Sequence, residues 1–313
     1  MVKRIFAIVG VILFLIPSFV YSQEMLKFRL GILPVIDTLP LVVGKERGIF
    51  KDQGVDMSLV SFNSALERDA ALRAGSIDGY FGDLLNTILL ANSGENLKII
   101  TQVYHTMLRQ YMFALVASPG SGIKTIDQIK DVPIAISSAS IIEYFLDEML
   151  SRADIPISFV KKMEVRTIPI RYQMLMGGSV KLALLPEPLA TMAISGGAVL
   201  IADDKMLDIT ATIVAIRGNV LQAYPRLATQ FLGAYGKAVH MINENPDAFK
   251  DILVKKTRFP ASLKEQYSIP PFPDPAPPSE TDVTRVQTWL VHKGLLSKEL
   301  AYKNLVWTGY VKG

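Results

Sequence analysis

The sequence predicts an α/β protein of two lobes, each built on a doubly wound and mostly parallel sheet. Short apolar strands alternate with helices along most of the chain, which is typical of parallel sheets. A strand-and-helix unit also occurs twice, because the segment 74–80 (AGSIDGY) is echoed by the segment 177–183 (GGSVKLA). The length of 313 residues allows two domains of ordinary size.

The first series of elements lies in the first third of the chain. Its predicted strands are 28–33, 56–60, 77–81 and 97–103. A helix follows each of the first three strands: one over 39–47, one over 64–75 and one that ends at about residue 91. Ser64 and Glu67 form a capping box, which marks the start of the second helix. Gly48 and Gly75 are typical helix ends.

The second series repeats this order. Its predicted strands are 132–136, 165–168, 182–185 and 199–201, with helices from 140 to 152, over 171–176 and over 189–195. Ser140 and Glu143 form another capping box. The apolar segments 111–116 and 212–216 are interpreted as two crossing strands of a hinge, so that residues 114–213 form a lobe inserted within the lobe of 23–113 and 214–313.

The remaining chain is mainly helical. A long amphipathic helix is expected over 224–243 at the back of the first lobe, and another over 281–292. The proline-rich stretch 270–278 is too short for a recognition array and reads as an ordered loop.

The N-terminus reads as a secretion signal over residues 1–22. Lys3 and Arg4 precede an apolar run from 5 to 20, and Ser22 offers a small residue at a cleavage site. An uncleaved anchor helix is the alternative, but Pro17 breaks a run that is already short for a membrane span. We therefore expect a periplasmic protein.

Composition excludes several classes of site. The chain has no cysteine, so it can form no disulfide, thiol nucleophile, thiolate metal site or cysteine-linked lipid anchor. The formal charge is +4, with Lys and Arg scattered, which does not favour nucleic-acid binding. Phosphate-loop, nucleophile-elbow and zinc-helix motifs are missing, and the three histidines are far apart. We expect no catalytic residue, metal or cofactor.

The candidate ligand-binding residues follow the ends of predicted parallel strands, where open α/β sheets bind ligands. They are Asp37, Thr38, Asn63, Gly82, Asp83, Ser137, Ser138, Ser140 and Glu187. Ordinary helix capping is the alternative for Asp37, Asn63 and Ser140. The serines suit an anion at a helix start. Arg166 and Arg171 could supply a counter-charge, with an exposed surface position as the alternative.

The chain resembles the periplasmic solute-binding proteins of ABC importers, in the sulfonate, taurine, nitrate and thiamine-pyrimidine group. The residues that carry the resemblance span about 28 to 304. Each motif alone has low specificity, but their order and spacing together are specific to this family. They are Gly31 to Leu33 with Asp37 and Pro40, Gly44 to Phe50, Gly54-Val55, Ala71 to Gly75 with Asp78, Ile126 to Lys130, Leu185 to Pro188, Pro225, and Asn243 to Pro246.

The resemblance implies a two-lobed, class II-like periplasmic binding protein fold that closes around a solute by a hinge. It implies a monomer that delivers this solute to an inner-membrane ABC permease with a cytoplasmic ATPase. Carboxylates at Asp37 and Glu187 would repel nitrate, so a small organic solute, anionic or heteroaromatic, fits better. Two alternatives remain: an enzyme on the same fold, of the menaquinone-pathway dehydratase or pyrimidine-synthesis kind, or a sensing partner of a signalling receptor.

Overall fold

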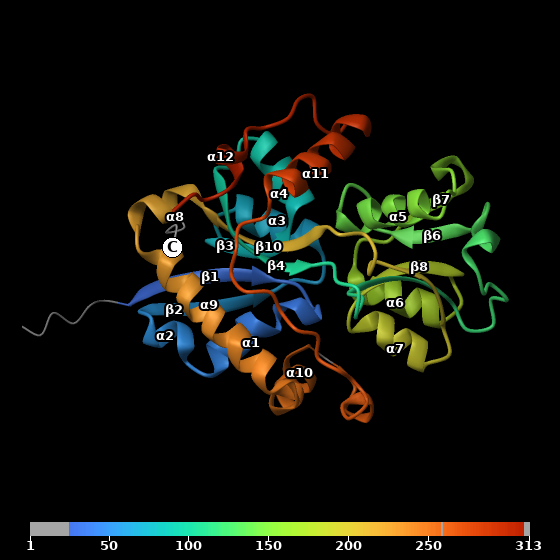
Figure 1. The fold of residues 1–313 in the computed structure, drawn as a ribbon, viewed down its shortest axis with the longest axis horizontal. Helices are drawn as coiled ribbons and strands as arrows, with labels where there is room; N and C mark the ends of the chain where they lie inside the picture. The colour runs from blue at the N-terminus through green and yellow to red at the C-terminus, as the bar shows by residue number, and fades with distance from the viewer. Residues whose placement is uncertain (1–24, 258, 310–313) are drawn as a thin grey trace, which may run out of the picture.

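The computed structural model describes residues 25–257 and 259–309, which form two α/β lobes side by side (Figure 1). The predicted signal at 1–22 lies outside these residues. Each lobe contains one five-stranded sheet with helices on both of its faces. Within the described ranges, no helix combines the length and the apolar character that crossing a membrane requires.

The sheet of the first lobe has the strand order β2-β1-β3-β10-β4. Its strands are β1 (Leu26–Ile32), β2 (Val55–Ser61), β3 (Gly79–Asp83), β4 (Leu97–His105) and β10 (Thr210–Arg217). The pairs β1–β2 and β1–β3 are parallel, whereas β10 runs antiparallel to both of its neighbours. The sheet is therefore mixed, because the chain inserts a late strand after its return from the second lobe.

The sheet of the second lobe has the order β7-β6-β8-β5-β9 and the same pattern. Its strands are β5 (Phe113–Ala117), β6 (Pro133–Ile136), β7 (Lys161–Glu164), β8 (Leu182–Pro186) and β9 (Val199–Asp203). Here β5 is antiparallel to β8 and β9. The repeated segments of the sequence thus lead into β3 and β8, which are the central strands of equivalent sheets.

Helices cover both faces of each sheet (Figure 1). In the first lobe they are α1 (Leu39–Glu46), α2 (Ile49–Asp52), α3 (Ala65–Arg73), α4 (Leu84–Asn92), α8 (Gly218–Ala223), α9 (Leu227–Glu244), α10 (Lys250–Thr257), α11 (Glu280–His292) and α12 (Tyr302–Leu305). In the second lobe they are α5 (Ile141–Arg152), α6 (Ile168–Met176) and α7 (Leu189–Ser195). Contacts of α9 with α1 and α2 form one face of the first lobe.

Both predicted helix starts at Ser64 and Ser140 are confirmed, but neither forms a complete capping box. Ser64 Oγ accepts a hydrogen bond from the Glu67 N–H at the start of α3, and Ser140 Oγ accepts one from the Ile142 N–H at the start of α5. Each box glutamate accepts from the residue just before the cap, so Glu143 binds the Ala139 N–H. These bonds satisfy amides that the helix itself leaves without partners.

One predicted strand is wrong. Residues 165–168 do not form a strand, because β7 ends at Glu164 and α6 begins at Ile168. Pro169 lies in the first turn of α6, where proline favours a helix start. The true strand is polar because it lies at the edge of its sheet, with both of its lysines at least partly exposed.

Candidate functional site

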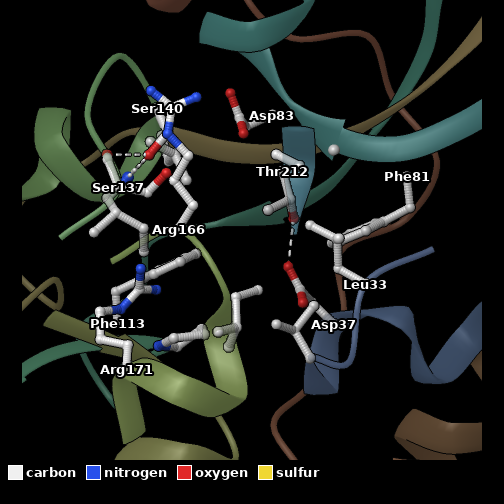
Figure 2. A pocket seen from close by; sticks show the side chains of 17 residues that line it. Leu33, Asp37, Phe81, Asp83, Phe113, Ser137, Ser140, Arg166, Arg171 and Thr212 are labelled. Carbon is white, nitrogen blue, oxygen red and sulfur yellow. Dashed lines mark hydrogen bonds between the residues drawn. The ribbon is translucent and has the colours of Figure 1, made fainter. Parts of the chain in front are cut away.

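A cavity lies between the two lobes, at the ends of β1, β3, β6 and β8 (Figure 2). It contains about 510 Å³ of space between protein atoms, including the part open to solvent. Its lining residues from the first lobe are Leu33, Val35, Asp37, Ala65, Phe81, Gly82, Asp83 and Thr212. Those from the second lobe are Phe113, Ser137, Ser140, Ile141, Ile142, Arg166, Ile168, Arg171 and Pro186.

Arg171, on the first turn of α6, is the most unusual side chain of this cavity. It is fully buried, and its Nη1 donates a 2.8 Å hydrogen bond to the Val165 carbonyl. Its Nε and Nη2 have no hydrogen-bond partner within the described residues. Burial lowers the pKa of Arg171 to about 10, which leaves the group charged at neutral pH. A buried guanidinium with free donors is a strong site for a carboxylate or sulfonate.

The wall above Arg171 is formed by the start of α5. Ser140 Oγ donates to the Ser137 carbonyl at 2.6 Å while it caps the helix. The N-terminus of a helix carries a partial positive charge that favours anions. This wall therefore has the same electrostatic sign as Arg171.

Glu164 fixes two parts of this wall at once. One of its carboxylate oxygens accepts from the Ser138 N–H at 2.9 Å, and the other pairs with Nε of Arg166. These bonds outweigh partial burial and lower the pKa of Glu164 below its ordinary range. Arg166 is half exposed, and it lines both this cavity and an outer one that extends toward α3 and α4.

The opposite wall, in the first lobe, carries Asp37. This residue lies in a single 3-10 turn, Ile36–Thr38, directly after β1, and it is buried. Thr212 of β10 donates a 2.7 Å hydrogen bond to its Oδ2 atom (Figure 2). Burial raises the pKa of Asp37 to about 7, although the Thr212 hydrogen bond opposes the shift.

Asp83 caps α4 at the same wall, where its Oδ1 accepts from the Asn86 N–H at 2.8 Å. Burial raises the pKa of Asp83 to about 6, against the attraction of the buried Arg68. Nη1 of Arg68 donates to the Phe81 carbonyl at 3.0 Å, and its guanidinium lies 4.3 Å from the centre of the Tyr80 ring. A side chain at Gly82 would clash with both groups, since a Cβ there would come within 2.5 Å of Arg68.

Five of the predicted site residues line the cavity, namely Asp37, Gly82, Asp83, Ser137 and Ser140. Four do not, namely Thr38, Asn63, Ser138 and Glu187. Thr38 uses its hydroxyl to bind the Val35 carbonyl. Ser138 lines only the outer cavity.

The other two non-lining residues hold the lobes together. The Asn63 carbonyl accepts from the Ile168 N–H at 3.1 Å, and the Glu187 carbonyl accepts from the Ile36 N–H at 3.1 Å. The Glu187 side chain is buried, and it accepts from Thr191 at 2.9 Å and from the Tyr267 hydroxyl of the first lobe at 3.4 Å. The Glu187 carboxylate, which the sequence indicated as a ligand contact, therefore faces the lobe interface.

A second interlobe contact joins α5 to α11. Trp289 of α11 and Lys293, which directly follows this helix, contact Oδ2 of Asp147 at 3.2 Å and 2.8 Å. Asp147 also pairs with Lys162 at 2.6 Å, and Lys293 approaches Glu143 at 3.3 Å. Since Glu143 also binds the loop before α5, this ion cluster connects the cavity wall to the first lobe.

The chemistry of the cavity favours binding. Its apolar lining includes Phe81 and Phe113, on opposite walls (Figure 2). No histidine or lysine is among the residues that line the cavity with its serines. The Ser140 hydroxyl donates its hydrogen bond to the Ser137 carbonyl. A serine nucleophile needs such a base to become reactive. Over the described ranges, no three histidine or acidic side chains come together as metal ligands would.

Comparisons with known proteins place this geometry in context. The model of the NMT1-like family matches residues 22–255. The fold is similar to the alkanesulfonate-binding protein SsuA from Xanthomonas axonopodis pv. citri, bound to MOPS, with a TM-score of 0.78 and 17% identity over 91% of this chain and 99% of that one. It is also similar to the periplasmic nitrate-binding protein NrtA from Synechocystis PCC 6803, with a TM-score of 0.70 and 14% identity over 90% and 84% of the two chains.

An enzyme shares the same fold. The desulfurization enzyme DSZB aligns with a TM-score of 0.66 and 13% identity over 90% of this chain and 96% of its own. A search of curated protein sequences gave no significant match. At these identities the structural comparisons establish the two-lobed fold of periplasmic binding proteins.

Proposed function

Since the chain belongs to the NMT1-like family, we propose that it is a periplasmic solute receptor of an ABC importer. In this proposal the two lobes close around a small organic acid and release it, chemically unchanged, to a membrane permease driven by a cytoplasmic ATPase. The protein acts as a monomer that leaves the cytoplasm through its N-terminal signal.

One observation carries the proposal: Arg171 lines the interlobe cavity, and two nitrogen atoms of its buried guanidinium have no hydrogen-bond partner among the described residues. A buried charge without a partner destabilises the protein, so its presence requires compensation from a ligand. A carboxylate or sulfonate supplies this compensation through charge-assisted hydrogen bonds. The aromatic and aliphatic lining accommodates the organic part of such a solute.

The hinge belongs to the same proposal. The chain passes between the sheets through residues 106–112 and 204–209, and we assign the hinge to these two crossings. The segments 111–116 and 212–216, which the sequence indicated as hinge strands, lie mostly in β5 and β10, inside the two sheets. A solute that touches both walls binds the closed form better than the open form, and only this difference shifts the population toward closure. The permease can then distinguish loaded from empty receptor by shape.

Thermal shift with a panel of carboxylates and sulfonates tests the function. Ligands that bind the folded state raise the melting temperature, so at least one acid should stabilise the wild-type protein. The variant Arg171→Met should lose that response, because it keeps an unbranched apolar side chain and removes the charged guanidinium. Stabilisation by neutral solutes alone, retained in Arg171→Met, would contradict the proposal. Consumption of the stabilising compound during incubation would indicate an enzyme.

A further inference from the structure

The charged groups of the cavity are separated by lobe. Arg166 and Arg171 lie on the wall of the second lobe, and Asp37 and Asp83 lie on the wall of the first (Figure 2). None of these four side chains forms an ion pair across the cavity in the part of the chain that is described. The empty space therefore separates a positive wall from a negative one.

The two carboxyl groups of the negative wall differ in their neighbours. Asp83 has the Arg68 guanidinium behind it, which partly offsets its charge. Asp37 has only the Thr212 hydroxyl as a side-chain donor, and over residues 25–257 and 259–309 no Lys, Arg or His pairs with it. Asp37 is thus the acidic counterpart of Arg171: a buried ionisable group that lines the cavity without an opposite charge.

The rest of the cavity lining is mainly apolar. It includes Leu33, Val35 and Phe81 from the first lobe and Phe113 and Ile142 from the second. Apolar surface provides no hydrogen bonds to the middle of a ligand, and it excludes water around both charged ends. The attraction of each end for its partner is stronger in such surroundings than in water.

We propose that the captured solute is dipolar, with an acidic group that binds Arg171 and a protonated amine that binds the Asp37 carboxylate. An aliphatic or aromatic body lies between them, in contact with the apolar lining. This inference rests on the proposed receptor function and specifies its substrate class. Asp37 becomes the specificity-determining residue, since it selects amino acids over plain acids of the same shape.

The protonation of Asp37 gives the proposal a pH signature. Burial holds the pKa of this carboxyl near 7, so that part of the population is neutral at physiological pH. An ammonium group favours the ionised form, and binding an amino compound therefore lowers this pKa and releases a proton. Binding of an amino compound should weaken as the pH falls below about 7, whereas binding of the plain acid should not.

Several elements contribute groups that act on the Asp37 carboxyl. Those with hydroxyl groups are Thr212 of β10, Tyr104 of β4, Tyr235 of α9, and Tyr267 in the segment after α10. The charged groups that share the cavity are Asp83, Arg166 and Arg171. Burial raises the pKa of each tyrosine above its ordinary range. Three other carboxyls titrate in the same range as Asp37: Asp83 in the cavity, with a pKa of about 6, Asp204 beside Tyr104, with a pKa of about 7, and Glu187 beside Tyr267, with a pKa of about 8. The pH dependence of binding in the wild type is therefore compared with that in the variant Asp37→Asn.

The test is calorimetric titration of the intact protein with matched pairs of probes. Each pair joins an amino acid to the acid without its amine: γ-aminobutyrate with butyrate, aminopropanesulfonate with propanesulfonate, and para-(aminomethyl)benzoate with para-toluate. A charge-assisted hydrogen bond contributes enough that the amino member of a binding pair should bind at least about tenfold more tightly. In Asp37→Asn, which keeps an acceptor for Thr212, this preference should fall to about twofold or less.

The matched control is Asp282→Asn. Asp282 is also a buried carboxyl of the first lobe, where it binds Ser279 at the start of α11, but it lies outside the hinge and does not line the cavity. Its replacement should leave the amino preference unchanged. If plain acids bind as tightly as their amino partners and still require Arg171, the dipolar assignment is overturned and the receptor function stands. If no probe binds the wild type or Arg171→Met, the dipolar assignment and the receptor function are both overturned.

Discussion

The Thr212 hydroxyl on β10 donates a 2.7 Å hydrogen bond to Oδ2 of Asp37, at the floor of the interlobe cavity. Asp37 follows the first strand of the chain, and Thr212 lies on the strand that returns from the second lobe. The bond thus joins two segments that are far apart in the sequence. It also orients the carboxyl to which we assign the amine of the solute.

Loss of this bond should change the titration of Asp37. In Thr212→Val a donor to the ionised form disappears, so the pKa of Asp37 should rise further above its ordinary value. The folded state should lose about 1 kcal/mol of stability. Carbon-detected NMR of the labelled carboxyl measures the pKa, and urea unfolding measures the stability. An unchanged pKa in Thr212→Val would show that the bond is not formed in solution.

The stability of the protein should fall as the pH rises from about 4 to about 8. Burial raises the pKa values of Asp37, Asp83, Glu187 and Asp204 to about 7, 6, 8 and 7. The folded state therefore holds protons that the unfolded chain has already released in this range. Stability contributed by these groups is fully present below their unfolded pKa values and is lost as the pH passes the folded ones.

Urea unfolding of the ligand-free protein over this pH range measures the effect. The variant Glu187→Gln should flatten the upper part of the curve, because Glu187 has the highest pKa of the four. The amide can still accept from Thr191, so the variant is expected to fold. Stability that increases steadily toward pH 8 would contradict the assignment of these carboxyls as neutral groups.

Arg171→Met should separate stability from binding. The ligand-free variant should be more stable than the wild type by about 1 to 3 kcal/mol, because a buried charge with unsatisfied donors is removed. The same variant should bind organic acids at least about tenfold more weakly. Unfolding curves with and without a stabilising acid measure both quantities. A destabilised variant would indicate that Arg171 supports the fold and not a ligand.

The α5–α11 ion cluster should favour the closed form. Lys293→Met removes the contacts to Asp147 and Glu143 and leaves Lys162 to neutralise these carboxylates. The ligand-free variant should shift toward the open form by about 1 kcal/mol, or about fivefold in population. Energy transfer between dyes on the two lobes reports the shift. High salt should reproduce it in the wild type.

A control variant exists for this prediction on the surface of the first lobe. His240 and Glu244 form an exposed pair along α9 with no contact to the second lobe. His240→Ala should leave the energy transfer unchanged. Equal transfer in Lys293→Met and the wild type, at low and high salt, would show that the cluster does not influence closure.

Gly82 should tolerate no side chain. In Gly82→Ala the new Cβ would overlap Arg68 and the Tyr80 ring, which are both buried. The expected cost is about 1 to 3 kcal/mol, with weaker binding because Asp83 follows directly. Gly233→Ala is the matched control, because its Cβ would make only an ordinary contact with Gln53, at 3.8 Å, and alanine has the higher helix propensity within α9. Urea unfolding should show a lower free energy of unfolding for Gly82→Ala and a higher one for Gly233→Ala than for the wild type.

Much of the fold was predictable because it depends on local chemistry. Ser64 and Ser140 mark helix starts through hydrogen bonds to residues two or three positions away. The strand β7 was not predictable in the same way, since none of its four residues is buried and it has no apolar face. Its position depends on pairing with β6, which periodicity alone does not encode.

The candidate site was predictable only in part, for a related reason. Strand ends indicate which loops meet, and this brought Asp37, Asp83 and Ser140 to one cavity. It does not indicate which way a side chain points. Glu187 follows a strand end as expected, yet its carboxylate faces Thr191 and Tyr267. The burial of Arg171 at the cavity could not be predicted from strand ends, since it depends on how α6 packs against β8.

Native mass spectrometry of the protein purified from its own cells, beside Arg171→Met prepared in the same way, tests the central claim most directly. The account predicts that the wild type carries one small organic acid, which is released with unchanged mass, and that the variant carries none. The same adduct at equal occupancy in both proteins would contradict it.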